Sequence, residues 1–194
     1  AKDACYAETF VKLLTARSDP QRLSLLCAFI DRLIDIDFNL VMRSLIPQSS
    51  VLALTCSNIL VAHVADHSNH PFLVRTILLL LGSIISERGA IVSEVPRERF
   101  TSTTLTFLSE KLNKASVALE GLKRALRSEA FRASFIENKG INLLLDLLKQ
   151  SQKVNNTDAL YHILFCIWAL TYSAEGAGQL AEGEFVPQLA RLLS

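Results

Sequence analysis

Residues 140–148 read GINLLLDLL, and this segment decides the fold class of the chain. Ile141, Leu144 and Leu148 recur at the i, i+3, i+7 spacing that places side chains on one face of an α-helix. Residues 185–193, FVPQLARLL, can be superimposed on it, and both segments end in paired leucines. The offset between them is about 45 residues, which is the spacing of an internal repeat.

This repeat period indicates an architecture. Armadillo and HEAT units recur at roughly 40–47 residues, and their helices stack because none buries its apolar face alone. The sequence has no alternating strand pattern and no Asn-Gly or Asp-Gly hairpin signal. We therefore predict an all-α fold, an armadillo/HEAT-type helical repeat solenoid, with residues 1–194 as a single helical-repeat domain. Because Ala1 replaces an initiator Met and the chain stops within an apolar pattern, we expect a fragment of a longer protein.

Prolines and polar clusters divide the first helices. Pro71 is expected to open an apolar helix that runs to about Glu87, and Pro96 to keep the next segment irregular. Thr101–Thr104 offer caps for a helix through about Asn113. A helix over residues 115–128 and a short turn over residues 129–136 should follow.

Further breaks are expected in the last third of the chain. Residues 138–140 form one break, and residues 155–158 form another, in which the sequon Asn155-Asn156-Thr157 caps the next helix. Gly176, Gly178 and Gly183 should mark the last turns before a helix that begins at about Phe185.

The composition excludes several classes of protein. Half of the residues are hydrophobic and the formal net charge is +1, so neither disorder nor a general attraction to nucleic acid is expected. The most apolar segment, residues 72–85, is interrupted by Arg75 and is shorter than the roughly 20 residues that a membrane helix needs, so we expect a buried core helix and no membrane insertion. The four cysteines lack C-x-x-C spacing and are interpreted as buried free thiols: Cys5, Cys27, Cys56 and Cys166.

One polar cluster could hold a metal. His63 and His67 are spaced i, i+4, and Asp66 and His70 lie beside them, so the four could ligate zinc if they converged. The cluster lacks the Glu of an H-E-x-x-H motif and precedes Pro71, at a helix end where the dipole favours histidines. We favour this second interpretation and predict no metal site, while a metal-dependent enzyme stays open as an alternative.

No pattern of catalytic or cofactor-binding residues stands out. Residues 176–181 match G-x-G-x-x-A, but a dinucleotide site needs a strand before the glycines, and a helical segment precedes them here. Asp31, Asp35 and Asp37 are better explained as hydrated residues at helix ends than as acid/base groups. We therefore expect no enzyme activity and no cofactor.

The weak candidates for partner binding form a basic stripe: Lys123, Arg124, Arg127 and Arg132. Glu120 is placed to pair with Arg124 at i, i+4, which is an ordinary surface arrangement. A solvated face is the default interpretation, and a docking patch for an acidic partner helix is the alternative. Trp168, the only tryptophan, lies at helical spacing with Leu164 and Thr171, and it is expected to pack in the core or between repeats rather than to form a binding hot spot.

Two stretches resemble a known family. Residues 161–172, YHILFCIWALTY, are similar to a helix in the H subunit of the V-type proton ATPase, which has the pattern Y-x-x-x-F-[CS]-[IL]-W-x-L-[TA]-[FY]. Residues 7–15, AETFVKLLT, resemble its [AE]-x-T-F-[VI]-x-L-[LM]-T motif, with Gln21 and residues 30–34 matching downstream. The order of these matches is that of the N-terminal armadillo/HEAT-like domain of the H subunit, while residues 49–114 are only loosely similar.

This resemblance implies a function. The family is a non-catalytic regulatory component of the vacuolar-type proton pump, peripheral on the cytosolic face of vacuolar and other endomembranes. It couples ATP hydrolysis to proton transport, and its N-terminal domain binds the peripheral stalk made by the E and G subunits. The alternative is a generic armadillo-repeat adaptor of the chaperone-cofactor or transport-receptor type. A transport receptor would show a ladder of Trp and Asn, and this chain has one Trp.

Overall fold

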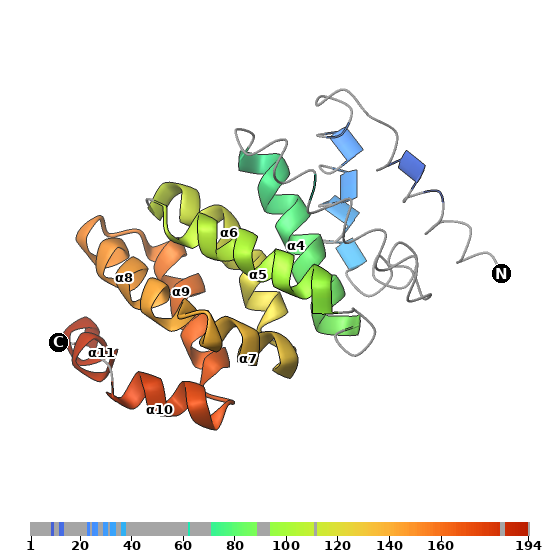
Figure 1. The fold of residues 1–194 in the computed structure, drawn as a ribbon. Helices are drawn as coiled ribbons and strands as arrows, with labels where there is room; N and C mark the ends of the chain where they lie inside the picture. Colours follow the sequence, from blue (N-terminus) through green and yellow to red (C-terminus); the bar gives the residue numbers. More distant parts are fainter. Residues whose placement is uncertain are drawn as a thin grey trace.

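The computed structural model describes residues 71–88, 94–110, 112–182 and 185–193, together with residues 9, 12–13, 23, 25–26, 29–30, 32–33, 36–37 and 62. The four described ranges between residues 71 and 193 contain eight helices and no strand, so the all-α prediction is confirmed (Figure 1). In chain order the helices are α4 (Pro71–Arg88), α5 (Glu94–Leu108), α6 (Leu112–Ala125), α7 (Glu129–Glu137), α8 (Gly140–Lys153), α9 (Thr157–Leu170), α10 (Ala174–Glu182) and α11 (Phe185–Leu193).

The helices form a stacked array with a repeated order. Helix α6 packs between α4 and α9, and α5 lies beside α8, so that two layers run along the array (Figure 1). The nine-residue helices α7 and α10 each precede one of the two segments that the sequence superimposes, α8 and α11. The internal repeat seen in the sequence is therefore a structural repeat of a short helix followed by an apolar one.

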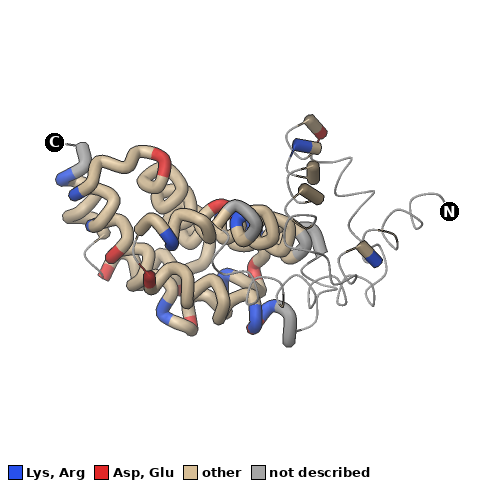
Figure 2. Tube along the Cα trace, turned by 90° about the horizontal axis from the view of Figure 1, so that it is seen from above, with Lys and Arg blue, Asp and Glu red and all other residues tan. Residues whose placement is uncertain are grey.

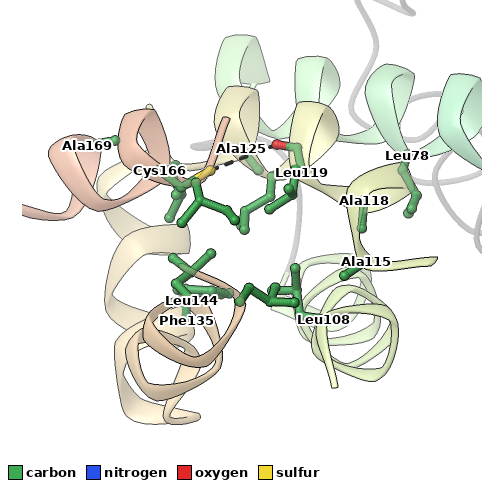
Figure 3. Close-up of a cluster of buried hydrophobic side chains, with 14 of the residues drawn as sticks. Leu78, Leu108, Ala115, Ala118, Leu119, Ala125, Phe135, Leu144, Cys166 and Ala169 are labelled. Atoms are coloured by element: carbon green, nitrogen blue, oxygen red, sulfur yellow. Dashed lines mark hydrogen bonds between the residues drawn. The ribbon is translucent and has the colours of Figure 1, made fainter. Parts of the chain in front are cut away.

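The core lies between the two layers. Leu119 of α6, Leu144 of α8 and Cys166 of α9 are fully buried and converge there, as Figure 3 shows. The Cys166 thiol donates to the carbonyl oxygen of Leu119 at 3.8 Å, and burial raises the pKa of this thiol. Cys166 is a buried free cysteine, as predicted, while Cys5, Cys27 and Cys56 lie outside the described residues.

Two glycines allow α4 and α6 to cross closely. A β-carbon built on Gly121 of α6 would lie 2.6 Å from the carbonyl carbon of Leu78, and one built on Gly82 of α4 would lie 2.9 Å from the carbonyl carbon of Gly121. Both distances are shorter than a non-bonded carbon contact, and the atoms that would be hit belong to the backbone. Only glycine fits at either position without separating the helices.

Three phenylalanines join α5 and α7. The ring of Phe131 lies 5.4 Å from that of Phe100 and 6.1 Å from that of Phe135, measured between centroids. All three side chains are fully buried. Gly140, the first residue of α8, lies against the Phe135 ring, so this cluster also contacts the start of the next helix.

The prediction that Pro96 keeps its segment irregular is wrong. Pro96 is the third residue of α5, within the first turn, where a missing N–H costs nothing because that N–H has no intrahelical partner. Thr101 and Thr104 lie inside α5 and are buried, so they do not cap a later helix. The hydroxyl of Thr101 donates to the carbonyl oxygen of Arg97 at 2.8 Å, which satisfies it within the helix.

Four further expectations about local structure are wrong. Helix α5 ends at Leu108 rather than near Asn113, and α6 covers residues 112–125 rather than 115–128. The expected turn over residues 129–136 is the helix α7, which the burial of its phenylalanines stabilises. Gly176 and Gly178 lie inside α10 rather than in a turn, and Gly183 is outside the described residues.

The predicted breaks before α8 and α9 are confirmed. Lys139 and Asn155 adopt left-handed backbone conformations, with φ of 61° and 52°, and turn the chain before each helix. Asn156 is the N-cap of α9, and its side-chain oxygen accepts from the backbone N–H of Ala159 at 3.0 Å. The polar triplet at residues 155–157 therefore acts as a cap, as predicted.

We expect Asn156→Ala to lower the free energy of unfolding by about 1 kcal/mol, because the N–H of Ala159 loses its acceptor. Urea unfolding followed by circular dichroism measures this loss. Asn142→Ala, at an exposed position inside α8, is the matched control and should change stability by less than about 0.5 kcal/mol. Equal effects of the two substitutions would contradict the capping role.

Candidate functional site

Helix α9 carries a row of aromatic side chains on its outer face. We call this row, Tyr161, Phe165, Trp168 and Tyr172, the α9 aromatic stripe; it continues beyond the end of the helix. Trp168 lies between its neighbours, 5.2 Å from the Phe165 ring and 5.1 Å from the Tyr172 ring, in edge-to-face contacts. Edge-to-face contact is a favourable arrangement for pairs of aromatic rings.

The expectation that Trp168 packs in the core is wrong. Its side chain is 53% exposed, and Tyr172 is 65% exposed. The core side of α9 is formed instead by Ile163, Cys166 and Ile167, which are buried. Since successive helix residues are rotated by about 100°, the position after Ile167 points away from that side.

A lysine of α6 crosses to this stripe. The Lys123 ammonium group lies over the Tyr161 and Phe165 rings, 5.4 Å and 5.3 Å from their centroids. A cation over two aromatic faces is attracted to both, which ties α6 to α9 and places a positive charge beside the stripe.

A hollow of about 420 Å³ opens at the other end of the stripe. Its lining comes from α7, α9 and the residues after α6 and α9: Leu126, Arg127, Arg132, Phe165, Trp168, Ala169 and Tyr172. The Arg132 guanidinium donates to the carbonyl oxygens of Leu126 at 2.8 Å and Arg127 at 3.0 Å. These bonds satisfy two carbonyl groups of the turn that follows α6 and hold the arginine in position.

The structure thus separates the four basic candidates. Lys123 lies on the stripe, while Arg127 and Arg132 line the hollow. Arg124 is half-buried and does not line it. Glu120, considered above as a partner for Arg124, accepts from Arg75 of α4 through Nη2 at 2.7 Å and Nε at 3.0 Å, an interhelical pair that sequence spacing could not indicate.

His162 lies beside the stripe among several charges. Burial lowers the pKa of His162, and so do the positive charges of Lys123 and, to a smaller extent, Arg75. The negative charges of Asp158 and Glu120 oppose this shift, and the Asp158 carboxylate lies 3.8 Å from Nε2 of His162. Since the folded-state pKa is below the ordinary value of 6.5, the unfolded chain binds the proton more tightly. The stabilising contribution of neutral His162 to the free energy of unfolding is therefore fully present above about pH 6.5, and it is lost as the pH falls through the folded-state pKa.

We expect the free energy of unfolding to fall as the pH is lowered from about 7.5 toward about 5, and the fall to be smaller in His162→Gln. Urea unfolding of both proteins at each pH isolates the contribution of His162 from that of other titrating groups. Parallel pH dependences in the two proteins would contradict the assignment.

A comparison with models of protein families shows to which family the chain belongs. The family model described as that of the V-ATPase H subunit matches residues 1–194, the whole chain. This chain belongs to the V-ATPase H-subunit family. The match is to the N-terminal domain of the H subunit, as the sequence resemblance predicted. Neither the curated proteins nor the solved structures yielded a match.

Membership in the V-ATPase H-subunit family makes the chain a component of the V-ATPase, and the other V-ATPase components its partners. Within the described residues, no group of histidines, cysteines and carboxylates is arranged to hold a metal. The cluster of His63, Asp66, His67 and His70 lies outside those residues, as do Asp31 and Asp35; Asp37 is exposed. None of the described helices has the length and apolar character that crossing a bilayer requires.

The distribution of charge does not by itself mark a site on this V-ATPase component. Basic and acidic residues are interspersed along the described helices (Figure 2). The α9 aromatic stripe is more distinctive, and it is not among the candidates predicted from the sequence, because Trp168 taken alone gives no indication of it. The signal that could have found it is the spacing of four aromatic residues at positions 161, 165, 168 and 172, which places them on one side of a helix.

Proposed function

We propose that the chain is a non-catalytic regulatory part of the vacuolar-type proton-pumping ATPase, and that it couples ATP hydrolysis to proton transport by binding the peripheral stalk. The observation that carries this proposal is the family match over residues 1–194. The E and G subunits form the stalk in this proposal. The chain corresponds to the N-terminal domain of a longer protein and lies on the cytosolic face of vacuolar and other endomembranes.

The packing of the helices supports a binding role. Stacked helices hold their outer side chains at fixed positions, so a partner meets a surface that needs little ordering. Rods made of paired helices are suited to such a surface, because they present side chains in rows that dock against the rows of another helix. Among the described residues, the α4–α6–α9 layer offers both cations and exposed aromatic rings for such a contact.

The proposal is tested by calorimetric titration of the chain with a purified E–G heterodimer from the same organism at physiological salt. We expect saturable binding with one chain per heterodimer. A leucine-zipper coiled coil of similar length and net charge is the control and should give no heat of binding. Absence of binding to the E–G heterodimer, with both proteins folded by circular dichroism, would overturn the proposal.

A further inference from the structure

The hollow beside the α9 aromatic stripe has the composition of a protein-binding site. Trp168 and Tyr172 expose more than half of their side chains side by side, although exposing aromatic rings to water costs free energy. Tryptophan, tyrosine and arginine are the residue types that most often dominate binding energy at interfaces. All three occur in the lining of this one hollow.

The size and the lining of the hollow indicate what enters it. Its volume of about 420 Å³ lies in the range of roughly 300–1,000 Å³ that ligand pockets occupy. The rings of Phe165 and Trp168, with Leu126 and Ala169, form apolar walls. A bulky apolar side chain would bury these walls and leave no polar atom of its own unpaired.

The charges around the hollow indicate what surrounds that side chain. Arg127 is exposed at its rim and Arg132 is held by two carbonyl oxygens, so a positive charge is fixed in place there. No carboxylate belongs to the lining. Lys123 adds a cation farther along the stripe. The cations are complementary to carboxylates, and the aromatic rings are complementary to an apolar side chain. A peptide that carries carboxylates next to an apolar anchor is therefore the occupant that this surface favours.

We propose that the hollow and the α9 aromatic stripe are the docking site for an acidic segment of the peripheral stalk. A bulky apolar side chain of that segment enters the hollow against Trp168, and its carboxylates face Arg127 and Lys123. The proposal rests on the proposed function for the source of the segment, and it adds the surface and the chemistry of the contact. The two hydrogen bonds of Arg132 fix one wall before binding, which reduces the ordering that binding must supply.

The first test compares stalk affinities of matched variants. Trp168→Ala should weaken calorimetric binding of the E–G heterodimer at least about thirtyfold, and Arg127→Glu about tenfold, with a weaker dependence on salt. Val186→Ala, at an exposed position of α11, and Arg99→Glu, at an exposed position of α5, are the controls and should bind within about twofold of the unaltered chain. Urea unfolding confirms that each variant is folded, and Tyr172→Ala replaces Trp168→Ala if that variant is not.

The second test uses Trp168 as a local reporter, because it is the only tryptophan of the chain. With stalk proteins whose own tryptophans are replaced by phenylalanine, binding should shift the Trp168 emission to shorter wavelength and protect it from acrylamide quenching. If the unaltered chain does not bind the heterodimer, the proposed function fails, and this proposal fails with it. If it binds while Trp168 emission is unchanged and both site variants bind like the controls, the proposed function survives and the docking site is wrong.

Discussion

Replacing Phe131 with alanine should lower the free energy of unfolding by about 3–5 kcal/mol. The ring is fully buried and touches Phe100 of α5 and Phe135 of its own helix, so its removal opens a cavity between α5 and α7. The rigid rings around it cannot collapse into the gap, which places the cost in the upper part of the range for core substitutions. Urea unfolding followed by circular dichroism measures the loss.

Tyr172→Ala is the matched control for this substitution. Tyr172 is 65% exposed and its ring contact is with Trp168, so we expect a loss of less than about 1 kcal/mol. Similar losses for Phe131→Ala and Tyr172→Ala would contradict the placement of Phe131 in the core and of Tyr172 on the surface.

Replacing Gly121 with alanine should destabilise the chain by about 3 kcal/mol, although alanine is the better helix former. The added methyl group would meet the backbone of Leu78, with its carbonyl carbon at 2.6 Å, and a backbone atom cannot rotate away as a side chain can. Helices α4 and α6 must therefore separate, which exposes apolar surface between them, such as the side chain of Leu78.

Gly178→Ala supplies the control of opposite sign. Gly178 lies in α10, and a β-carbon there would have no atom within 4 Å. We expect a gain of roughly 0.5–1 kcal/mol, because alanine loses less backbone entropy in a helix. Thermal and urea unfolding of the two variants should thus shift in opposite directions, and a stabilised Gly121→Ala variant would rule out the close crossing of α4 and α6.

The sequence predicts those helices best whose apolar residues recur regularly and whose ends carry clear signals. Helix α4 opens at Pro71 as predicted, and Asn156 caps α9 as predicted. Helix α7 escapes prediction because nine residues are too few for local propensity to form a stable helix. Burial of Phe131 and Phe135 stabilises it, and this burial depends on packing against α5 and α8.

Residues with low helix propensity also occur inside helices of this chain. Pro96 and Gly178 are helix breakers by propensity, yet each lies in a helix: Pro96 in a first turn, which tolerates it, and Gly178 at a position of α10 where nothing crowds the backbone.

The candidate site is the least predictable part. The sequence indicates the cations but not which of them gather at one place, because that depends on how α6, α7 and α9 pack. Arg132 of α7 is held at the hollow by its hydrogen bonds to the carbonyl oxygens of Leu126 and Arg127, in the turn that follows α6. The spacing of Trp168 fits a helix face, which favours a core position, and only the packing of α9 against α6 and α8 determines which face is covered.

The most direct test of the account is site-specific photocrosslinking in the assembled V-ATPase, with a photoreactive phenylalanine analogue in place of Tyr172 and, as a control, in place of Val186. The account predicts that the probe at position 172 crosslinks to one of the two stalk proteins, E or G, within a segment that mass spectrometry finds rich in carboxylates, and that the probe at position 186 does not. Crosslinks from position 172 only to other components, with none to the stalk of an assembled and active pump, would contradict it.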